Sequence, residues 1–170
     1  LLGDTSWALK LNQALEDLEA IAQLPGHKFI IRGNHDYWWS SVTKMTKATE
    51  GRFHFIQGHG DLILGGSRDY LCPNDTAFKE DTDRSIYERE LMRVEAALQE
   101  MDSLLAKAKE EHPEIQEEIR LLLLHYPPFN DENQASGFTD LMAKYKVDHC
   151  IFGHLHDQNS FARIPDQFGS

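Results

Sequence analysis

Short apolar runs alternate with longer amphipathic stretches along this chain of 170 residues. Apolar runs bounded by glycine, proline or polar residues are typical of buried strands. We expect such strands at 1–2, 28–31, 53–56, 61–64, 119–124 and 147–152. The short connection at 57–60 contains two glycines, which predicts that the two runs on either side of it form a hairpin.

Helical periodicity marks the stretches between these runs. Apolar residues spaced three or four apart predict a helix that begins near Thr5 or Ser6 and ends at Pro25-Gly26. Shorter helices are expected at 40–49 and 137–145. Strands and helices that alternate in this way indicate an α/β fold with a layered core, and the chain length favours a single domain spanning 1–170.

The longest helical pattern belongs to an acidic segment at about 80–118. Its apolar residues are spaced alternately four and three apart: Tyr87, Leu91, Val94, Leu98, Met101, Leu105 and Ala108. Such a stripe can form a coiled-coil seam, so a homo-oligomer joined through the 80–110 helix is one expectation. We favour the alternative, a long amphipathic helix packed on a sheet with its charges in solvent.

Composition narrows the partners and the compartment. The chain has 28 acidic and 17 basic side chains, and its net charge of −11 makes a nucleic-acid partner unlikely on electrostatic grounds. The longest apolar run is far shorter than the roughly 20 residues that span a bilayer, so we expect no membrane association. Only two cysteines, Cys72 and Cys150, are present, which favours a reducing, cytoplasmic location.

Four of the expected strands end in side chains that can bind a metal or transfer a proton. These residues are Asp4, then Asn34, His35 and Asp36, then His125, and finally His154 and His156. Open α/β sheets place their chemistry at the carboxyl ends of strands, so we expect these side chains to meet. Mixed oxygen and nitrogen ligands suit Mn, Fe or Zn better than Mg or Ca.

In order, the motifs Gly-Asp, Gly-Asn-His-Asp, a lone His after a strand and Gly-His-x-His resemble those of the calcineurin-like metallophosphoesterases. The resemblance covers the chain from Leu1 to about Asp157. The longer segments Gly-Asn-His-Asp-Tyr-Trp-Trp-Ser and His-Tyr-Pro-Pro-Phe-Asn are similar to a bacterial branch of predicted phosphohydrolases. The resemblance implies a layered α/β sandwich of two mixed sheets flanked by helices, with a metal site at one edge.

The resemblance also implies a pair of divalent metal ions. Asp4 would bridge them, Asn34, His125 and His154 would complete one site, and His156 would bind the second ion. The family's first motif, Asp-x-His, would precede Leu1. We therefore expect a fold that is incomplete at its N-terminus, an incomplete second metal site and an impaired activity of this fragment.

Two residues near the expected metals are assigned roles by the same resemblance. His35 would act as an acid or stabilise the transferring phosphoryl group. Many relatives orient this His with an Asp, but Trp7 occupies that position here, so Asp36 or a backbone carbonyl would have to orient it.

Arg68 lies in the segment 65–70, which we expect to be a flexible loop. Its guanidinium could hold a phosphate, or it could be solvated or ion-paired. The aromatic residues 37–39 could likewise stack a nucleobase, although packing beneath the site loop is the interpretation we favour.

The leading hypothesis is metal-dependent hydrolysis of phosphoester bonds, in monoesters or diesters, by a metal-activated water. The substrate would be a phosphorylated small molecule or a nucleotide. The alternative is a catalytically impaired scaffold on the same fold that binds metal or phosphate. Retention of His35 favours the enzyme, whereas the absence of Asp-x-His favours the scaffold.

Overall fold

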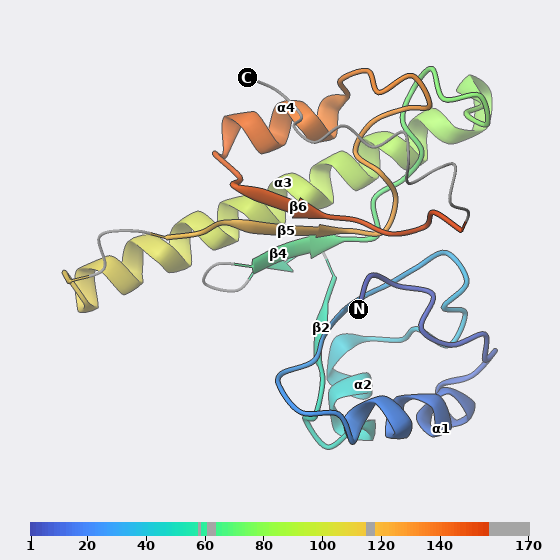
Figure 1. Cartoon of the computed structure of the whole chain (residues 1–170), viewed down its shortest axis with the longest axis vertical. Helices are drawn as coiled ribbons and strands as arrows, with labels where there is room; N and C mark the ends of the chain where they lie inside the picture. Colours follow the sequence, from blue (N-terminus) through green and yellow to red (C-terminus); the bar gives the residue numbers. More distant parts are fainter. Residues whose placement is uncertain (58, 61–63, 115–117, 157–170) are drawn as a thin grey trace.

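A computed structural model describes residues 1–57, 59–60, 64–114 and 118–156 (Figure 1). Its helices and strands follow the alternation expected from the sequence. In chain order they are α1 (Leu11–Ala22), β1 (Phe29–Ile31), α2 (Val42–Ala48), β2 (His54–Ile56), β3 (His59–Gly60), β4 (Leu64–Ser67), α3 (Glu80–Glu111), β5 (Leu121–Leu124), α4 (Gly137–Lys144) and β6 (His149–Ile151).

The strands form two separate sheets. In the first, β1 and β2 are parallel, with Ile30 opposite Phe55. The second has the order β3-β4-β5-β6, in which β3 is antiparallel to β4 and the other neighbours are parallel. Leu1 also runs parallel to β1, because its amino group donates to Phe29 O (2.7 Å) and its carbonyl accepts from Ile31 N (3.2 Å). The expected strand at 1–2 is therefore limited to this one pairing.

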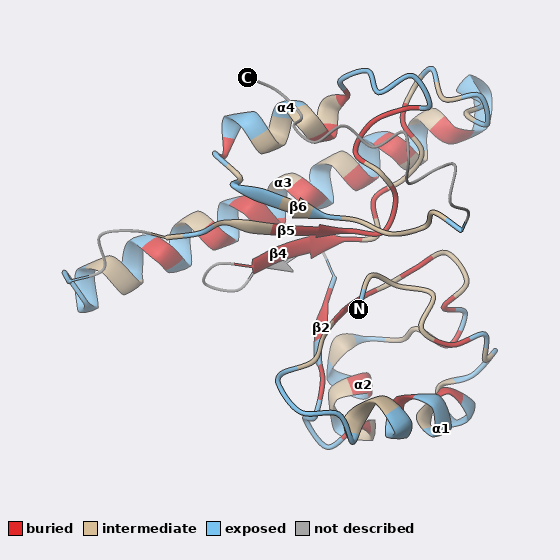
Figure 2. Ribbon diagram, viewed as in Figure 1, coloured by how far each residue is buried: buried red, intermediate tan, exposed pale blue. Residues whose placement is uncertain are grey.

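Alternate residues of the central strands face opposite layers, as the two-residue period of a strand requires. Ile30 packs with residues of α1 and α2, whereas Ile31 packs between the two sheets against Leu123. Leu122 and Leu124 face α3 and α4. Figure 2 shows β4 and β5 as largely buried. The order of layers is therefore helices, first sheet, second sheet, helices, which confirms the predicted layered α/β sandwich. Two mixed sheets were expected, but within the described residues the first sheet is parallel and only the second is mixed.

Helix α3 crosses the second sheet (Figure 1), and its apolar stripe packs against that sheet. Four of the stripe residues belong to the same core cluster as Leu122 of β5: Tyr87, Val94, Leu98 and Met101. The stripe is thus a packing face of the sandwich and is not free to form a coiled-coil seam. The expected homo-oligomer through the 80–110 helix depended on that seam, and no observation on the described residues supports it. No helix in the described part of the chain has both the length and the apolar character that a membrane span requires.

The expected hairpin between 53–56 and 61–64 is wrong. β2 pairs with β1 in the first sheet, and the hairpin is instead formed by β3 and β4 in the second sheet, with Gly60 opposite Gly65. Residues 61–63 lie outside the described part of the chain. A short segment that contains glycine can connect two strands of one hairpin or two strands of different sheets. The local sequence pattern therefore did not distinguish these two arrangements.

Two other boundaries differ from the prediction. Gly65 and Gly66, expected in a flexible loop, lie within β4, where their small size lets other backbones and side chains approach. Helix α1 begins at Leu11 instead of Thr5 or Ser6. The backbone N–H groups of Thr5 and Ser6 bind the carboxylate of Asp36 (2.9 and 3.2 Å), which holds this segment in a loop.

The packing of β4 generates a prediction about two neighbouring glycines. A Cβ atom on Gly66 would lie 2.9 Å from Leu123 O and 3.0 Å from Ile31 Cγ2, whereas one on Gly65 would come no closer than 3.8 Å to Ala97. Gly66→Ala should therefore lower the free energy of unfolding by roughly 1–3 kcal/mol through overpacking. Gly65→Ala is the matched control and should change it by less than about 1 kcal/mol. Urea denaturation measures both, and equal midpoints would contradict the prediction.

Candidate metal centre

Two glycine turns bring the first and second motifs into contact. Gly3 has a φ of +86°, and a Cβ atom on it would lie 2.5 Å from Gly33 Cα and 2.8 Å from His125 Nδ1. A Cβ atom on Gly33 would in turn overlap Asp4. Glycine is therefore required at both turns, because no larger residue permits this approach of the two backbones.

The carboxylate of Asp36 holds these two turns together. It is fully buried and accepts five N–H groups: the backbone N–H of Asp4 (2.8 Å), Thr5 (2.9 Å), Ser6 (3.2 Å) and Gly33 (2.8 Å), and the indole N–H of Trp38 (3.0 Å). Such charge-assisted bonds compensate a buried carboxylate. Within the described residues Asp36 makes no hydrogen bond to the imidazole of His35. The structure thus shows Asp36 holding the backbone of the site loops and not orienting His35.

Asp4 adopts a left-handed conformation, with a φ of +50°, which is uncommon and costly outside glycine. Its Oδ1 accepts the backbone N–H of His35 (2.8 Å). Its Oδ2 is buried, has no hydrogen-bond partner within the described part of the chain and lies 3.6 Å from His125 Nε2. A buried carboxylate oxygen with no donor is unfavourable unless a cation occupies the space in front of it.

His125 is buried at the end of β5 and its protonation state follows from its neighbours. Its Nδ1 lies 2.6 Å from Leu2 O. Because a carbonyl oxygen can only accept, Nδ1 carries the proton and Nε2 of the neutral ring offers its lone pair. That Nε2 lies 2.8 Å from Asn34 Oδ1 and 3.3 Å from His154 Nδ1.

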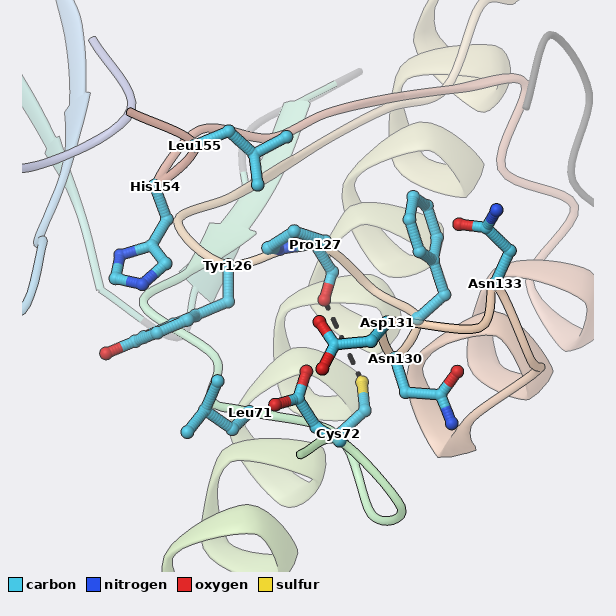
Figure 3. A pocket seen from close by; sticks show the side chains of 11 residues that line it. Leu71, Cys72, Tyr126, Pro127, Asn130, Asp131, Asn133, His154 and Leu155 are labelled. Carbon is cyan, nitrogen blue, oxygen red and sulfur yellow. Dashed lines mark hydrogen bonds between the residues drawn. The ribbon is translucent and has the colours of Figure 1, made fainter. Parts of the chain in front are cut away.

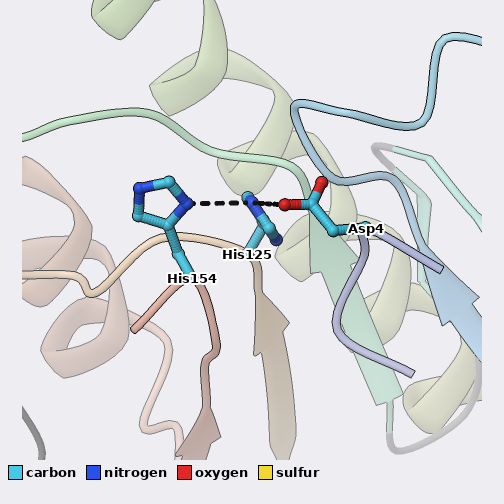
Figure 4. Close-up of side chains that lie close together, drawn as sticks. All are labelled: Asp4, His125 and His154. Atoms are coloured by element: carbon cyan, nitrogen blue, oxygen red, sulfur yellow. Dashed lines mark hydrogen bonds and ion pairs between the residues drawn. The ribbon is translucent and has the colours of Figure 1, made fainter. Parts of the chain in front are cut away.

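Four potential ligand atoms therefore converge at one point: Asp4 Oδ2, Asn34 Oδ1, His125 Nε2 and His154 Nδ1. The ligand atoms of Asp4, His125 and His154 all lie within 4.8 Å of one another (Figure 4). Burial lowers the pKa of His125, and burial together with the adjacent His125 lowers the pKa of His154 to about 4. Both rings are then neutral at pH 7, the form that binds metal. The donor set fits a divalent transition metal.

The other two predicted histidines lie at the rim of this cluster. His156 is exposed, and its ring centroid is 5.8 Å from that of His154. The ring of His35 stacks on Trp7 at 4.3 Å with an interplanar angle of 23°, and its Nδ1 lies 3.3 Å from the Tyr37 hydroxyl. Trp7 thus holds the His35 ring by stacking, in the position where an Asp is usual.

A family model described as calcineurin-like phosphoesterase matches residues 1–158, a range that contains all four motifs. The chain belongs to this family. Neither the curated proteins nor the solved structures contain a significant match. The general chemistry of the family is metal-dependent hydrolysis of phosphoester bonds, which agrees with the cluster of oxygen and nitrogen ligands in this chain.

Arg68 lies in a cluster of charged side chains. Its Nη2 is 4.0 Å from the carboxylate of Glu90, a fully buried residue of α3 that also pairs with Arg93 (2.7 Å). The guanidinium of Arg68 also lies 5.9 Å from the centroid of the Tyr70 ring. Of the two interpretations offered by the sequence, the structure thus shows the ion-paired arginine; a role in binding phosphate stays a prediction. Of the residues 37–39, Trp38 is 2% exposed and packs in the core with the half-buried Trp39, as favoured, whereas Tyr37 is 53% exposed and does not.

Asp69 is a positioning residue that the sequence analysis missed. It is buried, and its Oδ1 accepts the backbone N–H of His125 (3.0 Å) and of Tyr126 (2.8 Å), which fixes the turn after β5. Burial raises its pKa well above the usual value for an aspartate. The sequence contains a signal for this role, because Asp69 follows an apolar run as Asp4 does. The predicted strand ended at residue 64, since the two glycines of β4 were assigned to a flexible loop.

The five donors to Asp36 lead to a prediction about the loops. In Asp36→Asn one acceptor oxygen becomes an NH₂ group that faces N–H donors, so the metal-free protein should lose at least ~2 kcal/mol of unfolding free energy. Urea denaturation measures the loss. The control Asp81→Asn removes an exposed carboxylate from the first turn of α3, where it interacts with the helix dipole, and should change the stability by less than about 1 kcal/mol. A loss of equal size in both variants would contradict the role of Asp36.

Proposed function

We propose that this protein hydrolyses phosphomonoesters or phosphodiesters at a divalent metal site formed by Asp4, Asn34, His125 and His154. The observation that carries the proposal is the buried Asp4 Oδ2. It has no hydrogen-bond partner among the described residues and lies 3.6 Å from His125 Nε2, to which Asn34 Oδ1 and His154 Nδ1 are also adjacent. A bound cation there would polarise the phosphoryl oxygens and supply an activated water.

The chain's own residues would position the substrate and move the proton. The His35 ring is clamped between Trp7 and the Tyr37 hydroxyl, and its backbone N–H binds Asp4. With Nδ1 directed at Tyr37, the opposite nitrogen Nε2 is free to carry the proton that the leaving oxygen needs. We therefore assign His35 as the general acid or as a donor that stabilises the transferring phosphoryl group. Asp36 contributes by fixing the backbone from which both Asp4 and His35 project.

A second metal ion is the finer part of the proposal. Asp4 would be shared by both ions and His156 would bind the second one, consistent with the nearness of its ring to His154. Mn, Fe and Zn are the metals that this ligand chemistry favours. The predicted substrate is a phosphorylated small molecule or a nucleotide. The negative net charge argues against a nucleic acid, and a cytoplasmic location remains our expectation.

The metal site can be tested without any assay of activity. His125→Ala and His154→Ala each remove one ligand, so both should bind clearly less Mn²⁺ or Zn²⁺ than the unchanged chain after equilibrium dialysis and elemental analysis. His149→Ala is the matched control, because it removes an exposed imidazole of β6. Circular dichroism checks that each variant is folded. Unchanged metal content in both test variants would overturn the assignment.

The role of His35 predicts a selective loss of turnover. With bis(p-nitrophenyl) phosphate and millimolar Mn²⁺, His35→Ala should reduce kcat by ~10²–10⁴-fold while the metal content stays the same. Tyr37→Phe removes only the hydroxyl beside Nδ1 and should have an effect below about tenfold. A loss below about tenfold in His35→Ala would contradict an acid or stabilising role. If the unchanged chain binds metal but hydrolyses no phosphoester, the scaffold alternative holds instead.

A further inference from the structure

A small cavity lies apart from the metal centre, where strands of the two sheets end. The cavity that opens beside His154 (Figure 3) has a volume of about 190 Å³ and belongs to the surroundings of the metal centre. The small cavity has a volume of about 20 Å³ and shares no lining residue with the larger one. Residues from the ends of β1, β2 and β4 and from α3 form its lining.

The lining of the small cavity carries an excess of positive charge. Arg32, Arg68 and Arg93 contribute three guanidinium groups, whereas Glu90 is the one acidic residue among the described residues of the lining. The chain as a whole has a net charge of −11, so this group of cations is the opposite of the average charge of the protein. Clustered positive charges in a partly enclosed site attract anions.

The carboxylate of Glu90 is already bonded to other groups. Glu90 is fully buried, its Oε1 accepts from Arg93 Nη1 (2.7 Å), and its Oε2 accepts from the Ser67 hydroxyl (3.3 Å). Arg68 Nη2 is farther away, at 4.0 Å. Arg89, which lies outside the lining, adds a further positive charge 3.6 Å from the same carboxylate. One negative charge therefore faces several guanidinium groups and cannot compensate all of them.

Arg32 makes no ion pair in the described part of the chain, although it is half-buried. Its Nε, like that of Arg68, is buried and has no acceptor among the described residues. Burial lowers the pKa of the Arg32 guanidinium, and the positive charges of Arg68 and Arg93 lower it further. A buried donor without an acceptor and a buried charge without a counter-charge are both unfavourable. An anion that accepts hydrogen bonds from these arginines would compensate for both.

The volume of the cavity limits the anion to a small one. A cavity of about 10–15 Å³ holds one water molecule, so one of about 20 Å³ accepts a single species of that size or slightly larger. Chloride and bromide meet this limit, whereas a tetrahedral phosphate with four oxygen atoms does not. A water molecule would also fit, but it would leave the charge of the arginines uncompensated.

We propose that Arg32 and Arg68 bind a monatomic halide, normally chloride, in this cavity. The ion would link the first sheet to the second, because Arg32 directly follows β1 and Arg68 directly follows β4. The next residues along the chain are Gly33, at the turn that contacts Asp4, and Asp69, which fixes the turn after β5. Bound chloride should therefore stabilise the arrangement of the two sheets, independently of the proposed hydrolysis.

The dependence of stability on chloride tests this proposal. Sodium chloride replaces sodium methanesulfonate at constant ionic strength, so that the general screening of charges stays the same. In the metal-free protein chloride cannot bind to a metal ion, and the urea midpoint should rise as expected for one chloride site in the folded state. In Arg32→Gln the Kd for chloride should increase at least about tenfold, which corresponds to about 1.4 kcal/mol of binding free energy.

Arg52→Gln is the matched control, because it removes an exposed arginine that pairs with Glu19 and lies outside the lining. This variant should keep the chloride dependence of the unchanged chain. Arg68→Gln is a second test variant, used if Arg32→Gln does not fold, and should also weaken chloride binding. If the midpoint of the unchanged chain is independent of chloride, or rises equally in test and control variants, the inference is overturned and water occupies the cavity.

Bromide locates the site directly. In crystals of the metal-free protein equilibrated with sodium bromide near the measured Kd, we expect an anomalous peak within hydrogen-bonding distance of guanidinium nitrogens of Arg32 and Arg68. Crystals of Arg32→Gln should lack this peak. Its absence from the unchanged chain would refute the halide site even if chloride raises the stability by another route.

Discussion

The buried carboxylate of Asp36 is the interaction on which the site depends. It accepts hydrogen bonds from backbone N–H groups of the turn after Gly3 and of the turn after β1. These bonds fix both backbones at the distance that places the carboxylate of Asp4 next to His125. A buried carboxylate is stable only when its oxygens accept hydrogen bonds. The five donors therefore stabilise the buried charge of Asp36, and that charge in turn holds the two loops in place. Asp36 thereby determines the geometry of a centre to which its own side chain contributes no ligand atom.

The layered sheets supply the second constraint. Ile31 and Leu123 pack against each other between the sheets, and Gly66 permits this close approach. Because β4, β5 and β6 are parallel, their carboxyl ends lie at one edge, where Asp69 fixes the turn that carries His125. Asp4 and His154 both have a positive φ, a backbone conformation that is strained for residues other than glycine. A cation shared by their side chains would compensate for this local strain.

The sequence by itself determined the local features of this protein. Helical periodicity was sufficient for α3, and a short apolar run bounded by polar residues and proline was sufficient for β5. Position after a strand was sufficient to group Asp4, Asn34, His125 and His154, because strands in a layered α/β fold deliver their last residues to a common edge. Motif order was sufficient for the family.

Only the tertiary structure decided which distant partner each side chain has. Asp36 and Asp4 are separated by 32 positions, and nothing near Asp36 in the sequence indicates that it binds that backbone. Trp7 stacks on His35, Arg68 pairs with Glu90, and β2 joins β1 instead of its neighbour β3. Periodicity reports which face of an element is buried, whereas hydrogen bonds and ion pairs depend on which elements the packing of the two sheets brings together. That packing is a property of the whole chain, and no single segment encodes it.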